Sequence, residues 1–182
     1  GYAEGVRIME KITDRVGLDT QMGINASVAV AQSYEERKKF KLYLEPLLQM
    51  KDSRGKYIRW TDIRLMRRML RDAAYRAYDP EKTLTHWHYV RASELRNIIP
   101  NHVYADMIIN SAMPYEISIY KPKLFDKFKI WQDKYSRDPL RADAYERAER
   151  VCRVLEEING IEDDSFVPSD SVIREFIGGS SL

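Results

Sequence analysis

Apolar residues recur every three or four positions in several stretches of the chain, a spacing typical of amphipathic helices. A first such helix is predicted from Ala3 to about Val16, where Gly17 can end it. A second is predicted over residues 61–78, with Thr61 or Asp62 as its cap. Further helices are predicted from Asp79 towards Ile99, from just after Pro122 to Tyr135, between Pro139 and Gly160, and over residues 169–177.

Three short segments have a pattern typical of β-strands. Phe40–Glu45 alternates apolar and polar positions and leads directly into Pro46. Two apolar runs, Tyr104–Asn110 and Tyr115–Tyr120, are predicted as further strands, buried on both faces. Strands that alternate with helices are typical of an α/β layer architecture, here one short sheet flanked by helices. Residues 1–39 are expected to form an N-terminal helix and a junction to which no role is assigned.

The composition fits a single globular domain, because 44% of the 182 residues are hydrophobic and 32% are charged. No apolar run approaches the roughly 18 residues that a membrane-spanning helix needs, which argues against a membrane partner. The formal net charge is only +2, so the field of the whole protein would not recruit nucleic acid. Any anion-binding site must therefore be local. A lone cysteine, Cys152, excludes an internal disulfide framework and favours a reducing, cytoplasmic location.

Four arginines in the predicted helix 61–78 share one face. At about 100° per residue, an arc of ~100° contains Arg64, Arg67, Arg68 and Arg71, and the opposite side carries Met66, Met69, Leu70, Ala73 and Ala77. Like charges at these spacings repel by a few tenths of a kcal/mol per pair, so a bound anion would relieve them. Guanidinium is well matched to phosphate because it stays charged and offers a rigid two-pronged donor. The alternative is a solvated face neutralised by Asp62, Asp72 and carboxylates from elsewhere in the chain.

Three motifs follow one another along the chain: RLMRRMLRDAAYRAYDPEKTL at residues 64–84, YADMIINSAMPYEI at residues 104–117, and REFIGGS at residues 174–180. Together they resemble the C-terminal half of uridine kinase-like proteins of the phosphoribulokinase and uridine kinase family. The bacterial members with a REFIGGS-type tail are especially similar. The resemblance covers roughly residues 40–180 and implies that residues 40–182 form a uridine kinase-like C-terminal region.

The resemblance implies a partial P-loop kinase core of three layers, in which the arginine helix is a lid over the phosphates. Phosphate or substrate contact would then fall to Arg64, Arg67, Arg68, Arg71 and Arg76. It also implies ATP and magnesium as cofactors, and transfer of the γ-phosphoryl group of a nucleoside triphosphate to a nucleoside or similar hydroxyl. One departure is Ala77, where many relatives have glycine. This difference bears on the flexibility of the lid.

A phosphate-cradling P-loop of the form GxxxxGK[ST] does not occur in the sequence. Gly55 and Lys56 are followed by Tyr57 and lack the preceding glycine. The chain is therefore expected to be a portion of a kinase that is not active alone. The alternative is a non-catalytic binding module that uses the same arginine face for RNA phosphate or an acidic partner.

Other residues with chemical potential are weaker candidates. His86 and His88 would point about 200° apart on a helix, so no metal site is predicted from them. Glu45 stands at the end of a strand, where α/β folds place ligand groups, although an edge carboxylate is as often merely solvated. Asp106 is expected to be a conformational anchor that accepts hydrogen bonds or pairs with an arginine. Cys152 is predicted to be a thiol of the hydrophobic core.

Aromatic residues at helical spacing form a further pattern, with Phe128, Trp131 and Tyr135 on one stripe. Basic residues do not interleave this stripe on the same face, so a base-stacking platform is not indicated. The stripe is predicted to belong to the core or to an interface.

Overall fold

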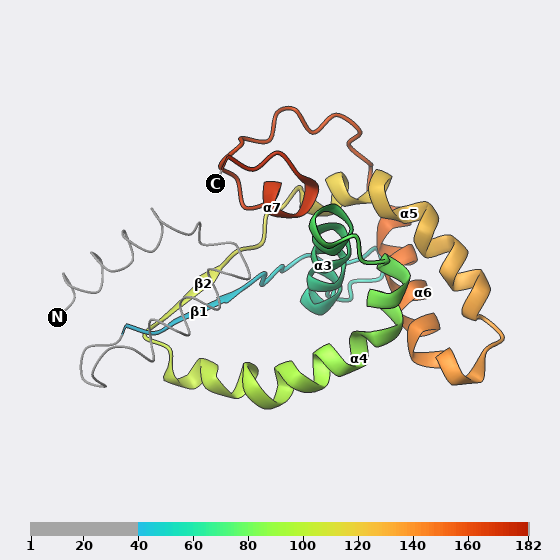
Figure 1. Ribbon diagram of the computed structural model, residues 1–182, viewed down its shortest axis with the longest axis horizontal. Coiled ribbons are helices and arrows are strands. Elements are labelled where there is room, and N and C mark those ends of the chain that lie inside the picture. Colours follow the sequence, from blue (N-terminus) through green and yellow to red (C-terminus); the bar gives the residue numbers. More distant parts are fainter. Residues whose placement is uncertain (1–39, 182) are drawn as a thin grey trace.

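The computed structural model describes residues 40–181, and the segment 1–39 with its predicted helix lies outside the described residues. The protein is α/β and rich in helix, with a two-stranded parallel sheet. In chain order the elements are β1 Leu42–Glu45, α3 Trp60–Arg76, α4 Pro80–Asn97, the 3-10 helix η2 Ile99–Tyr104, β2 Met107–Asn110, α5 Glu116–Tyr135, the 3-10 helix η3 Pro139–Arg141, α6 Ala142–Glu157 and α7 Arg174–Ile177. Figure 1 shows α3 near the centre, α5 and α6 side by side, and the C-terminal segment with α7 on the opposite side of α3 from α4.

The sheet consists of β1 and β2, which pair in parallel with Leu42 opposite Met107 and Glu45 opposite Asn110. A parallel pair needs a long crossover, and α3 and α4 supply it. Asp106 fastens the start of the sheet, because its Oδ2 accepts a hydrogen bond from the Lys41 amide at 2.6 Å. The prediction that this carboxylate is an anchor is therefore confirmed.

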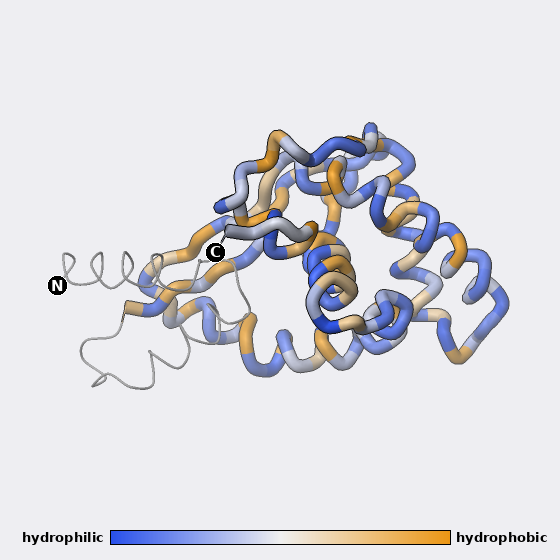
Figure 2. The backbone as a smooth tube through the Cα atoms, turned by 45° about the horizontal axis from the view of Figure 1, so that its top comes forward, coloured by the Kyte–Doolittle hydropathy of each residue, from blue (hydrophilic) through white to orange (hydrophobic). Residues whose placement is uncertain are grey.

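Strand β2 is shorter and more exposed than the pattern of Tyr104–Asn110 predicts. It begins at Met107, and the side chains of Met107 and Ile108 are 45% and 52% exposed. Figure 2 shows hydrophobic residues along this part of the chain. Parallel sheets are normally covered on both faces, so the apolar composition of β2 indicated burial that the described residues do not provide.

The prediction of a strand at Tyr115–Tyr120 is wrong, because these residues form the start of α5. A short apolar run that is buried on all sides cannot be assigned to strand or helix by periodicity alone. Here Glu116, Ile117, Ile119 and Tyr120 are all buried. The helical form also places Glu116 and Tyr120 one turn apart, where the Tyr120 hydroxyl donates to the carboxylate at 3.0 Å.

Helix α5 continues through Pro122, although the pattern predicted that the helix would begin after this proline. Proline has no N–H, so the carbonyl of Ser118 loses its usual partner within the helix. The Ile161 amide, from the segment that follows α6, donates to this carbonyl at 3.0 Å instead. A contact from outside the helix thus satisfies the carbonyl that the proline leaves open.

The helical core confirms two predictions. The stripe of Phe128, Trp131 and Tyr135 is buried, and so is Cys152 on α6. Burial raises the pKa of the Cys152 thiol to about 11, which keeps it protonated near neutral pH. The predicted helix between Pro139 and Gly160 is observed as η3 followed by α6.

The ends of the helices follow the predicted signals only in part. Asp79 caps α4 by accepting the Glu81 amide at 2.9 Å, as predicted, but α4 ends at Asn97 and gives way to η2. The expected cap of α3 is wrong: its N-cap is Arg59, without a side-chain hydrogen bond. Asp62 instead accepts two hydrogen bonds from Arg150 on α6, at 2.7 and 2.8 Å. Of the helix predicted over residues 169–177, only α7 is regular helix.

Helix α3 ends at Arg76, and its C-cap is Ala77, with φ 48°. Among the described residues, Ala77 is the one non-glycine residue with a positive φ. Side chains are disfavoured in this left-handed conformation, which is why glycine is common at this position of helices. The helix is also exposed from Ala73 onward, so Ala73 and Ala77 do not belong to its buried face as predicted. Met66 and Met69 do.

Candidate functional site: the arginine pocket of helix α3

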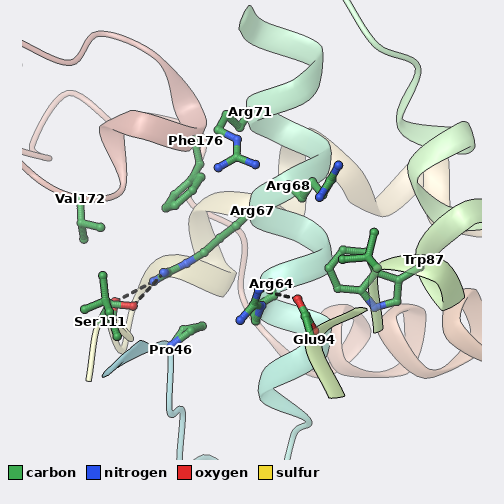
Figure 3. A pocket seen from close by; sticks show the side chains of 12 residues that line it. Pro46, Arg64, Arg67, Arg68, Arg71, Trp87, Glu94, Ser111, Val172 and Phe176 are labelled. Carbon is green, nitrogen blue, oxygen red and sulfur yellow. Dashed lines mark hydrogen bonds and ion pairs between the residues drawn. The ribbon is translucent and has the colours of Figure 1, made fainter. Parts of the chain in front are cut away.

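The structure brings the four arginines of the predicted face together around one cavity of about 90 Å³, here called the arginine pocket (Figure 3). Its lining comes from β1 and the following residue, α3, α4, the residue after β2, and the C-terminal segment. The lining residues are Leu44, Pro46, Arg64, Arg67, Arg68, Arg71, Trp87, Val90, Glu94, Ser111, Val172 and Phe176. The cavity therefore lies at the carboxyl ends of both parallel strands, where α/β folds bind ligands.

Arg67 is the most buried of the four, and each of its guanidinium nitrogens donates a hydrogen bond within the protein. Its Nε and Nη2 donate to the two carboxylate oxygens of Glu116 at 2.8 and 3.1 Å. It also donates to the Ser111 hydroxyl at 3.1 Å and to the Ser111 carbonyl at 2.7 Å. Phe176 lies against the guanidinium at 4.9 Å. Burial disfavours the charged form, but the Glu116 carboxylate outweighs it and raises the pKa of Arg67. Arg67 thus joins α3 to α5 and to the end of β2.

Arg64 lies between two buried carboxylates. Its Nη1 donates to Glu45 Oε1 at 2.5 Å, and its Nη2 contacts Glu94 Oε1. Burial raises the pKa of Glu45, against the attraction of Arg64. Burial and the Glu45 charge also raise the pKa of the Tyr43 hydroxyl to about 12. Glu45 therefore holds Arg64 and is not a solvated edge carboxylate.

Arg68, Arg71 and Arg76 have far less negative charge around them. All three contact one carboxylate, Asp72, at 3.1, 3.7 and 3.1 Å, and Glu175 also attracts Arg71. The Arg71 side chain is only 14% exposed, and its buried Nε has no hydrogen-bond partner among residues 40–181. Burial lowers the pKa of Arg71 accordingly. Arg76 is half-exposed and does not line the pocket.

Three acidic or polar residues of the site have no counterpart among the sequence-based candidates. Glu94, Ser111 and Glu116 are buried and contact the arginines. Glu94 follows Trp87 and Val90 at helical spacing, so a carboxylate within a stripe of buried residues was the available signal. Glu116 lies inside the segment that was predicted as a strand at 115–120, and no pattern in the sequence indicated Ser111, which follows β2.

The histidines do not converge. The Nδ1 of His86 hydrogen-bonds the Lys82 carbonyl at 2.8 Å, whereas that of His88 lies 3.3 Å from Asp143. Across residues 40–181 no group of three or more histidine, cysteine or acidic side chains is arranged to hold a metal ion. The acidic side chain that lines the arginine pocket, Glu94, is paired with Arg64 and Arg91, so among the described residues it offers no free carboxylate to the magnesium ion that the resemblance implies.

Comparisons with known proteins add no assignment. No protein-family model matches the chain, and no curated protein or solved structure gives a significant match. Within the described residues, none of the helices combines the length and apolar character needed to cross a membrane.

Proposed function

We propose that this chain is the lid and C-terminal part of a uridine kinase-like phosphotransferase. Its arginine pocket would bind the phosphate groups of a nucleotide during transfer of the γ-phosphoryl group to a nucleoside or similar hydroxyl. The chain is then not active alone, because no P-loop stands in it to hold the triphosphate.

The environment of Arg71 carries this proposal. Within residues 40–181 this mostly buried guanidinium has an ion contact with Asp72 at 3.7 Å, attraction from Glu175 and no hydrogen bond from its Nε, so its burial is poorly compensated. Arg68 is at the same end of the pocket and shares the same carboxylate, Asp72. A bound phosphate would accept hydrogen bonds from both guanidiniums and supply the missing negative charge.

The sheet supports the view that the chain is part of a larger kinase core. In the part of the chain that the structure describes, the two-stranded parallel sheet leaves Met107 and Ile108 exposed, without the layers that parallel sheets need on both faces. A three-layer core like that of P-loop kinases would extend the sheet and cover these side chains. In such an arrangement the arginine pocket stays at the carboxyl edge of the sheet.

The chemistry suits phosphoryl transfer, in which proteins act mainly by positioning groups and stabilising charge. Arg68 and Arg71 would neutralise phosphate oxygens as charge moves from donor to acceptor. Arg67 is occupied by Glu116 and would act by holding α3 in place.

The test is a calorimetric titration of the chain with inorganic pyrophosphate at low ionic strength. We expect binding that weakens about 10-fold or more in Arg71→Ala, since a partly desolvated, charge-assisted contact contributes about 1.5–3 kcal/mol. The control is Arg137→Ala, which removes the same charge from an exposed site after α5 and should leave the affinity unchanged. Equal affinities in the wild type and Arg71→Ala would overturn the proposal.

A binding module is the second candidate, favoured by the missing P-loop. It would use the same arginines for RNA phosphate or an acidic partner. Tight binding of a single-stranded RNA together with weak binding of pyrophosphate would favour this function over the first.

A further inference from the structure

A second cavity lies between the loop of residues 51–59 and helix α6, and is here called the loop pocket. Its volume is about 170 Å³. Asp62 on α3 lines this cavity, whereas Arg64 lines the arginine pocket. Two residues of an α-helix turn by about 200°, so the two cavities lie on different sides of α3. The loop pocket is therefore separate from the site proposed above.

The loop that forms one wall of this pocket is held in place by hydrogen bonds. The Asp52 amide donates to the Lys56 carbonyl at 2.8 Å, and Asp52 Oδ1 accepts from the amides of Arg54 and Lys56 at 3.1 and 2.8 Å. The Ser53 amide and hydroxyl donate to the carboxylate of Glu157, at the end of α6, at 2.7 and 2.8 Å. Because the loop is bonded both to itself and to α6, the cavity between them is preformed.

Both carboxylates that line the loop pocket are engaged within the protein. Asp52 Oδ2 accepts a hydrogen bond from Arg54 at 3.0 Å, in addition to the two loop amides on its other oxygen. Asp62 accepts two hydrogen bonds from Arg150, at 2.7 and 2.8 Å. These contacts form two ion pairs, and neither carboxylate is left to neutralise a further cation.

Three further cations line the same cavity: Lys56, Arg59 and Arg153. The first two are exposed, and within residues 40–181 neither side chain has a hydrogen bond or an ion pair. Arg153 contacts Glu149 at 3.5 Å, but these side chains are 37% and 40% exposed, so the pair is weak. Helix α3 also begins here, with Arg59 as an N-cap that forms no side-chain hydrogen bond. The loop pocket therefore has an excess of accessible positive charge.

The chemistry of this excess favours a phosphate group. A phosphate offers several acceptor oxygens and up to two negative charges, so it can bridge cations that approach from the loop and from α6. The basic residues surround one cavity and do not follow an extended track, which favours a small ligand over a strand of nucleic acid.

We propose that the loop pocket is a second anion-binding site, in which Lys56, Arg59 and Arg153 hold a small phosphate-bearing ligand. This inference goes beyond the proposed function and does not depend on the arginine pocket. The chemistry is shared by free inorganic phosphates and by the phosphate of a nucleotide. Tyr57 also lines the cavity and is 64% exposed, so its ring is accessible to the base of a nucleotide.

Lys56 provides a local measure of binding, since no described lysine lines the arginine pocket. The chain is treated briefly with an amine-acetylating ester at low ionic strength, with increasing inorganic pyrophosphate, and each lysine is followed by mass spectrometry. We expect pyrophosphate to slow the acetylation of Lys56 about threefold or more. The exposed Lys127 on α5 should react at an unchanged rate.

The variant Arg59→Ala/Arg153→Ala tests the other two cations. The pyrophosphate concentration that half-protects Lys56 should rise about 10-fold or more, as the loss of charge-assisted contacts allows. Arg96→Ala/Arg137→Ala is the matched control, because it removes two exposed arginines that line neither pocket. Protection should be unchanged in this control and also in Arg71→Ala.

Inorganic phosphate and AMP distinguish the two sources of ligand. Protection by AMP at about 10-fold lower concentration, with the gain lost in Tyr57→Ala, assigns the pocket to a nucleotide. Equal protection by the two assigns it to a free phosphate.

Circular dichroism establishes that each variant is folded. If Arg59→Ala/Arg153→Ala does not fold, Arg153→Gln alone should raise the half-protecting concentration about threefold. Absence of protection at Lys56, or the same protection with and without the two arginines, overturns the inference. An equal loss in the matched control would show general attraction between charges, and a loss in Arg71→Ala would place the anion in the arginine pocket; each result also overturns it. In all these cases the calorimetric test of the arginine pocket stands by itself.

Discussion

The two ends of the arginine face on α3 have the same residue type but opposite surroundings. Arg64 and Arg67 contact three buried carboxylates, supplied by β1, α4 and α5. Arg68, Arg71 and Arg76 share one carboxylate, which comes from α3 itself. Partners from other elements therefore make the first pair part of the protein's framework, whereas the ion contacts of the second group stay within α3.

The strongest test of the difference between the two ends of the arginine face is the removal of Arg67. Arg67→Ala leaves the Glu116 carboxylate buried without its cation, which typically costs about 3–5 kcal/mol. We expect the free energy of unfolding to fall by about that amount, measured by urea denaturation followed by circular dichroism.

Arg68→Ala is the matched control from the other end of the face. Its side chain is 38% exposed, and Asp72 keeps Arg71 and Arg76 as partners. The loss in stability should stay below about 1 kcal/mol. Equal losses for the two variants would show that the two ends do not differ.

A second prediction concerns pH and the framework end of the face. Burial raises the pKa of Glu45 above its ordinary value of 4.5, so the folded state keeps a proton that the unfolded state has already lost. This contribution is fully present below the ordinary value and is lost as pH rises through the raised value.

Glu45→Gln removes the titration, so its unfolding free energy should decline less with rising pH than that of the wild type. The measurement is the difference between the two proteins in urea-unfolding series from about pH 4.5 to pH 7. Carboxylates with a lowered pKa act in the opposite sense in both proteins; Asp164, hydrogen-bonded by Lys123, is one of them. A difference that does not vary with pH would contradict the account of Glu45.

The smallest expected effect concerns Ala77, the residue that follows α3. Ala77→Gly removes the strain of the left-handed conformation at φ 48° and should stabilise the fold by about 0.5–1 kcal/mol. Thermal unfolding would show a higher midpoint. A matched substitution, Ala73→Gly within the exposed part of α3, should instead destabilise by about 1 kcal/mol. A lower midpoint for Ala77→Gly would contradict the account of backbone strain at Ala77.

Local patterns in the sequence predict much of the helical part. The range 61–78 differs from α3 by one or two residues, and Asp79 with Pro80 mark the start of α4 correctly. The shared face of Arg64, Arg67, Arg68 and Arg71 follows from helical geometry alone. These features depend on residues close together in the chain.

Features that depend on distant partners could not be predicted in this way. Which arginine is neutralised depends on Glu45, Glu94 and Glu116, and the last of these is 49 residues from Arg67. The segment Tyr115–Tyr120 is helical because its buried acid and tyrosine serve Arg67, a tertiary demand that periodicity does not contain. For β2, the apolar composition indicated burial on both faces, which residues 40–181 do not provide.

Pro122 gives α5 a dependence on the order in which the chain is made. The Ser118 carbonyl beside it is satisfied by the amide of Ile161, which is synthesised only after the rest of α5 and all of α6. During synthesis from the N-terminus, this turn of α5 keeps a carbonyl open to water until that later residue leaves the ribosome. A proline within a helix thereby replaces a hydrogen bond within one turn by one that needs a residue beyond the next helix.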